Sequence, residues 1–145
     1  EVRESVLNVA RYDMFKLTEA MLAGDVARTS RMIEGLRAEG ESIVPIVWAL
    51  TDEVRKLNLF KTQTEAGEYL PNLLRQNRVW GLREKLIPQA LPRLSNDFLK
   101  SALRRTGDLD RMAKGLDKTD PWDATLRLAN QIALKIGTAP SRKTR

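Results

Sequence analysis

The 145-residue sequence contains no cysteine and no histidine. Without cysteine there is no disulfide and no thiolate metal site, which fits a reducing cytoplasm. Without histidine the chain lacks the usual zinc ligands, the Ser-His and Cys-His nucleophile pairs, and the commonest general base near neutral pH. Carboxylates or lysines catalyse near neutral pH only when their pKa values are shifted, and no pattern here demands such a shift. We therefore expect no catalytic residue, no metal site and no cofactor in this chain.

Long apolar runs and a leader segment are also missing. No stretch approaches the ~18 apolar residues that a membrane-spanning helix needs. These absences favour a soluble, cytoplasmic protein with no membrane partner. The chain begins at Glu1 rather than at a methionine and enters a helical pattern at Val2, so we interpret it as a piece of a longer polypeptide.

Apolar residues between Phe15 and Leu59 recur at helical spacing in three groups. Gly24 and Gly40 follow the first two groups and are suited to end helices, whereas Asp25 and Ser42 are suited to begin them. The connections are short, so the three helices should lie antiparallel. No strand pattern occurs, and the sequence predicts an all-α fold, an antiparallel bundle of about five to six helices.

The second half of the chain predicts further helices after an interruption at residues 61–72, which we expect to be the longest internal connection. One helix should cover Val79 to Leu91, another should begin after Ser95 and extend to Leu116, and the last should begin at Asp120-Pro121. Two of the three tryptophans should belong to the core, one because it lies within an apolar run of a predicted helix and the other because it lies in the first turn of the last helix. These two are Trp48 and Trp122.

Basic residues concentrate in residues 75–105, which hold eight basic and two acidic side chains, whereas residues 1–74 have a net charge of −3. A phosphate-binding surface needs several cations close together, because each neutralised phosphate releases counterions. Long basic side chains also cover helix surfaces for solubility, which is the competing interpretation. After Gly137 and Pro140 the sequence predicts a disordered basic tail.

Trp80 stands among Arg75, Arg78 and Arg83 within the basic segment. An aromatic ring among cations is typical of surfaces that bind single-stranded nucleic acid, since bases stack on the ring and cations follow the backbone. The same spacing is compatible with Trp80 packing inward beside Val79. The candidate DNA-binding residues are therefore Arg75, Arg78, Trp80 and Arg83.

Six segments together resemble the C-terminal part of the delta-subunit family of bacterial DNA polymerase III, a clamp-loader component. They are Phe15–Asp25, Leu36–Glu41, Trp48–Leu50, Glu53–Arg55, Arg78–Trp80 and Asp120–Trp122. The resemblance implies a collar-type helical domain over residues 12–137, preceded at residues 1–11 by the end of a small lid-type helical domain and followed at residues 138–145 by the tail.

In that family, collar domains of delta, delta prime and three gamma or tau subunits form a pentameric ring, and the complex loads the sliding clamp on primed DNA. The resemblance implies assembly with delta prime and gamma/tau subunits, and a contact between single-stranded template and Trp80, Arg78 and Arg83. The resemblance implies that the sliding clamp is bound only through the delta N-terminal domain, which this sequence lacks. It also implies that the DNA polymerase activity belongs to the whole holoenzyme.

A free-standing helical DNA-binding module, such as a transcription regulator, is the alternative. It would place a helix of the basic segment in the major groove and read bases with polar side chains such as Gln76 and Asn77. No tight helix-turn-helix is evident around these two residues.

Overall fold

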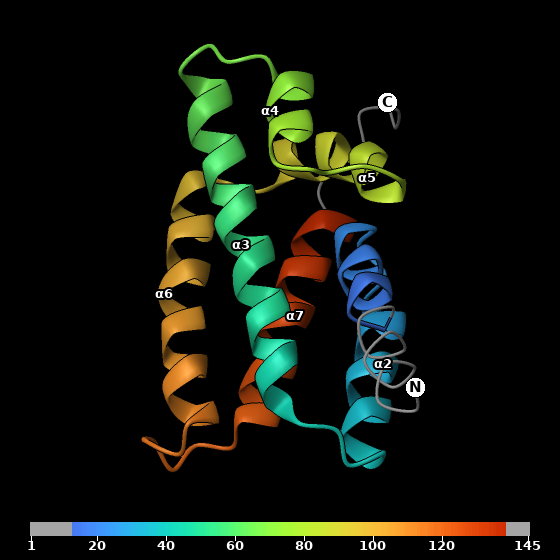
Figure 1. Cartoon of the computed structure of the whole chain (residues 1–145), viewed down its shortest axis with the longest axis vertical. Coiled ribbons are helices and arrows are strands. Elements are labelled where there is room, and N and C mark those ends of the chain that lie inside the picture. The colour runs from blue at the N-terminus through green and yellow to red at the C-terminus, as the bar shows by residue number, and fades with distance from the viewer. Residues whose placement is uncertain (1–12, 139–145) are drawn as a thin grey trace, which may run out of the picture.

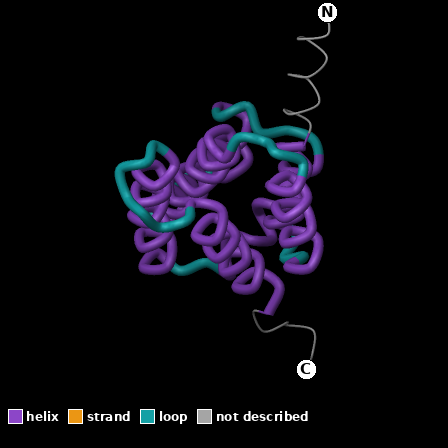
Figure 2. Tube along the Cα trace, turned by 90° about the horizontal axis from the view of Figure 1, so that it is seen from below, coloured by secondary structure: helices purple, strands orange, loops and turns teal. Residues whose placement is uncertain are grey.

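A computed structural model describes residues 13–138 of the chain. The expected lid-domain remnant at residues 1–11 lies outside the described residues, as does all but the first residue of the expected tail at 138–145. Figure 1 shows the helices running alternately up and down around a shared core. Among residues 13–138 every regular element is a helix and no strand is present, which confirms the all-α bundle (Figure 2).

Seven α-helices and one short 3₁₀ helix make up the described part of the chain. A helical segment at residues 13–22 is followed by α2 (Val26–Ala38), α3 (Ile43–Glu65), α4 (Leu70–Gln76), α5 (Leu82–Ala90), η1 (Leu91–Arg93), α6 (Asn96–Ala113) and α7 (Pro121–Thr138). The seven-residue α4 was not predicted from the sequence, because its apolar residues are too few to show a period.

The long helix α3 organises the bundle. It packs mainly against α6, while α2 packs against α7 and α6 against α7. Its side chains at Val54, Leu57 and Phe60 are fully buried. The short helices α4 and α5 lie at the end of the bundle where α3 finishes (Figure 1).

Predicted helix boundaries agree with the structure where capping residues mark them. Asp25 accepts a hydrogen bond from the backbone N–H of Arg28, and Ser42 and Ser95 accept one each from the next helix. Gly24 and Gly40 have φ angles of 76° and 79°, as left-handed C-terminal caps require.

Three sequence predictions about boundaries are wrong. Residues 61–65 continue α3, so the interruption shrinks to residues 66–69. The hydroxyls of Thr62 and Thr64 bond carbonyls of the preceding turn, so both residues are accommodated within the helix. The helix expected from Val79 begins only at Leu82. Leu116 lies beyond the end of α6 and is 72% exposed rather than part of its apolar face.

Trp48 was predicted to lie in the core, and that prediction is wrong because its side chain is 67% exposed. Successive helical residues are about 100° apart, so Trp48 lies opposite the buried Ile46. The local sequence is apolar on both faces of the helix and therefore does not reveal which face is buried. Trp122 is partly buried and packs against the core, as predicted.

Candidate nucleic-acid interface

The connection between α4 and α5 is the segment that carries Trp80. At the end of α4, the N–H of Arg78 donates to the carbonyl of Arg75 at 3.1 Å and the N–H of Val79 donates to that of Leu74 at 2.8 Å. This pair of bonds is a Schellman motif, in which the residue at the Arg78 position must adopt a left-handed conformation. Val79 and Leu74 are both 3% exposed, so the loop is anchored in the core.

Arg78 has a φ of 58° and is the single non-glycine residue among the described ones with a positive φ. The four other Schellman motifs in the described chain have glycine at this position, namely Gly24, Gly40, Gly67 and Gly115. An L-residue in this conformation costs roughly 1–2 kcal/mol relative to glycine. A strained cation where the fold elsewhere uses glycine points to a role for its side chain other than folding.

Trp80 follows with its side chain 67% exposed, so the inward-packing interpretation is wrong. Gly81, with φ 71° and ψ −145°, then redirects the chain into α5. Arg75 is also exposed, and its guanidinium donates to the side-chain oxygen of Asn72 at 2.5 Å. The loop and the last turn of α4 therefore present an exposed indole and two exposed guanidiniums, Arg75 and Arg78.

Arg83 is different from the other three candidate residues because it is buried. It is 8% exposed, and its Nη2 donates to Oε1 of Glu53 on α3 at 2.7 Å. The ion pair ties the first turn of α5 to α3, and it argues against a direct DNA contact for Arg83. Glu53 is the sequence signal that could have revealed the burial of Arg83. It lies on the apolar face of α3, and a carboxylate in that position requires a buried partner.

The buried pair is incompletely satisfied. Neither Oε2 of Glu53 nor Nε of Arg83 has a hydrogen-bond partner. Burial raises the pKa of Glu53, and this effect exceeds the lowering by the charge and hydrogen bond of Arg83. The pair therefore fixes the position of α5 at some electrostatic cost.

Two of the remaining cations of residues 75–105 are bound to α7 rather than free to join Trp80. Arg93 donates to the carbonyl of Ile136 at the end of α7 at 2.6 Å, and Arg105 of α6 donates to Gln131 of α7. These arginines connect η1 and α6 to α7. Part of the charge that clusters in the sequence is thus used for structure.

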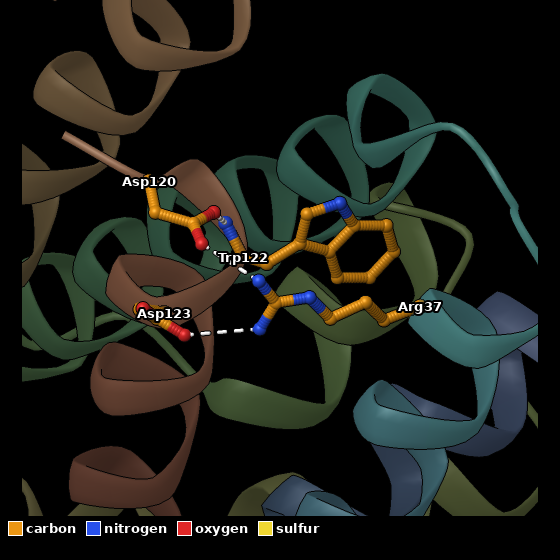
Figure 3. A network of polar contacts seen from close by, with 4 residues as sticks. All are labelled: Arg37, Asp120, Trp122 and Asp123. Carbon is orange, nitrogen blue, oxygen red and sulfur yellow. Dashed lines mark hydrogen bonds and ion pairs between the residues drawn. The ribbon is translucent and has the colours of Figure 1, made fainter. Parts of the chain in front are cut away.

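A second polar network joins α2 to the start of α7 (Figure 3). Asp120 accepts the backbone N–H of Trp122 through Oδ1 at 2.9 Å and binds Nη2 of Arg37 through Oδ2 at 2.7 Å. Nη1 of Arg37 reaches Asp123 at 3.0 Å. The hydrogen bond to Asp123 is the main cause that raises the pKa of Arg37. The Asp-Pro-Trp turn is thereby explained as a helix start with an interhelical tie.

Neither a metal-binding group of side chains nor a membrane-spanning helix is present in the part of the chain that the structure covers. Among residues 13–138 no three carboxylate side chains come close enough to share a metal ion. Within the same range, no helix has the length and apolar character needed to cross a bilayer.

Comparison with known proteins reveals relatives of this chain. Residues 14–126 match the family described as "Processivity clamp loader gamma complex DNA pol III C-term". The chain is 31% identical over 103 residues to DNA polymerase III subunit delta of Escherichia coli (strain K12). The alignment covers 71% of this chain and 30% of that relative, so this chain spans less than a third of the relative's length.

Proposed function

Because this chain belongs to the family of C-terminal domains of the clamp-loader delta subunit, we propose that it is the domain through which delta docks with the other loader subunits. Its partners are delta prime and the gamma/tau subunits, and the product is a pentameric collar. The collar allows the complex to load the sliding clamp on primed DNA. Contact with the clamp belongs to other parts of the delta subunit.

The observation that carries this proposal is the set of large apolar side chains left uncovered after the core is filled. They come from several elements and are between 36% and 72% exposed. Apolar side chains that adjoin on a protein surface mark interaction sites, and Trp48 and Phe15 border two hollows that share Asp52. Apart from Trp80, which we assign to DNA below, the exposed set comprises Phe15, Val44, Trp48, Tyr69, Leu82, Leu116 and Leu134.

Size-exclusion chromatography of this chain with purified delta prime and gamma/tau subunits tests the assembly role. At micromolar concentrations we expect the chain to elute with its partners, since a stable contact buries about 800 Å² on each side. Separate elution of all components would contradict the proposal.

We further propose that the exposed loop containing Arg78 and Trp80, together with Arg75, contacts single-stranded template DNA. The support is the geometry described above, because a base stacked on an indole gains about 1–3 kcal/mol and neighbouring guanidiniums bind phosphates. Arg83 takes part only indirectly, through the ion pair that holds α5.

Tryptophan fluorescence tests this contact. Single-stranded DNA at low salt should quench the emission, and Trp80→Ala should remove the quench and weaken binding. Trp48→Phe removes another indole of equal exposure and serves as the matched control; it should leave DNA affinity unchanged. An unaltered quench in Trp80→Ala would refute the stacking contact.

The competing function, a free-standing module that reads duplex DNA, has less support. The helix before Trp80 has only seven residues, and the side-chain amide of Asn77 donates to the carbonyl of Leu73 at 2.8 Å instead of pointing outward unpaired. Tight, sequence-specific binding of the isolated chain to a duplex would favour that function over ours.

A further inference from the structure

A groove lies between the neighbouring helices α3 and α6. Its volume is about 700 Å³, and it runs along helices that lie side by side in Figure 1. Trp48, Thr51 and Arg55 line it from α3, and Leu103, Gly107 and Asp110 line it from α6. Trp48 borders the groove with two thirds of its side chain exposed.

Gly107 makes the groove deeper than a helix of ordinary side chains would. It lies in the interior of α6, where glycine costs about 1 kcal/mol relative to alanine. A Cβ atom placed on Gly107 would meet no atom of the chain within 4 Å. Packing inside this chain therefore gives no reason for glycine here, and in the groove the bare backbone at Gly107 lets another molecule approach α6 closely.

The charges at the groove define what would bind there. Asp52 is paired with Lys56 at 3.0 Å and Asp110 with Lys114 at 2.9 Å, each within its own helix. Arg55 is exposed and has no ion pair with any described residue. A binding partner should therefore bring apolar side chains for Trp48 and a carboxylate for Arg55. The two carboxylates of the groove disfavour a nucleic-acid backbone.

The surface continues across α3. A second hollow, of about 110 Å³, lies between α3 and residues 14–18, and Phe15 at its edge is 53% exposed. Asp52 lines both hollows, so only the outer ridge of α3 separates them. The apolar side chains on both sides of this ridge can therefore belong to one contact.

We propose that the groove between α3 and α6, with Trp48 and Arg55 at its border, receives an apolar helix of a neighbouring clamp-loader subunit that presents a carboxylate to Arg55. This inference rests on the assembly role proposed above and assigns that role to one face. Exposed tryptophan and arginine are the residue types that most often dominate the binding energy of an interface. The backbone of the partner's helix passes over Gly107.

Dissociation constants for the chain with delta prime and with gamma/tau test the inference. Trp48→Ala should weaken the affected pair at least about tenfold, as for a central interface residue. Arg55→Glu should weaken it as well, and a carboxylate-to-lysine change on the partner should restore binding.

Gly107→Gln separates binding from folding. It replaces a helical glycine with a better helix former, so it should raise the melting temperature while it obstructs the groove and weakens the complex. Gly35→Gln is the matched control, because Gly35 is also a helical glycine with no atom near its Cβ position, but on α2. It should raise the melting temperature and leave the complex intact.

The outcomes distinguish the inference from the function on which it rests. If the unaltered chain binds no loader subunit, both are overturned. If the unaltered chain binds a loader subunit and the Trp48→Ala and Gly107→Gln variants bind it equally well, the assembly role stands and the assignment to this groove is wrong. Self-association of the chain that Trp48→Ala abolishes would assign the groove to a second copy and would also overturn the inference.

Discussion

Replacement of Arg78 by glycine should make the domain more stable and worse at binding DNA. Arg78 occupies the left-handed position of a Schellman motif with φ 58°. Glycine relieves roughly 1–2 kcal/mol of backbone strain there. Its greater conformational freedom in the unfolded chain lowers the stability by about 0.5–1 kcal/mol. The net gain should be about 0.5–1 kcal/mol, which raises the melting temperature by about 2–4 °C for a chain of this size.

The cost should appear in DNA binding. Each phosphate contact to single-stranded DNA contributes about 0.7 to the slope of log affinity against log salt concentration. Arg78→Gly should therefore weaken binding and reduce that slope by about this amount. Fluorescence anisotropy with labelled single strands measures both, and circular dichroism at rising temperature measures the stability.

Arg78→Lys is the control, because it keeps both the charge and the backbone strain. It should show nearly unchanged stability and most of the DNA affinity. The reasoning fails if Arg78→Gly lowers the melting temperature, or if it leaves both the affinity and its salt dependence unchanged.

Four other substitutions test contacts within the domain. A Cβ on Gly24 would lie 2.7 Å from the Cα of Gly137, so Gly24→Ala should lower the free energy of unfolding by about 2 kcal/mol or more. A Cβ on Gly35 would meet no atom, so Gly35→Ala should raise that free energy by up to about 1 kcal/mol. Unfolding in urea measures both changes. Burial raises the pKa of Glu53 above its ordinary value of 4.5, so the folded chain binds this proton more tightly than the unfolded chain does. The free energy of unfolding should therefore fall as the pH rises from 4.5 through the raised pKa. Glu53→Gln should flatten this dependence of stability on pH, and an unchanged dependence would contradict the raised pKa. Arg37→Gln breaks the tie to α7 and should lower the melting temperature more at low salt than at high salt; equal effects at both would contradict an electrostatic tie.

Local signals in the sequence predicted what local physics controls. Glycine after an apolar group marked the ends of helices at Gly24 and Gly40, and side-chain caps marked the starts at Asp25 and Ser42. These positions are decided by hydrogen bonds within a few residues, so no knowledge of the tertiary structure was needed.

The errors concern side chains whose direction depends on tertiary contacts. Trp48 was misassigned because both faces of its helix are apolar in the sequence, and only packing selects the buried one. Arg83 was grouped with the exposed arginines because its partner Glu53 is 30 positions away. Spacing along the chain placed Trp80 in a helix that in the structure begins only at Leu82, and it left the direction of the indole open.

Hydroxyl-radical footprinting of Trp48 and Trp80 tests the central claim that two separate faces serve assembly and DNA. Both indoles are equally exposed in the chain alone, so mass spectrometry should find both oxidised. Addition of the other loader subunits should protect Trp48 and leave Trp80 reactive, and single-stranded DNA should then protect Trp80. A Trp48 that remains fully reactive in the assembled loader would contradict the account.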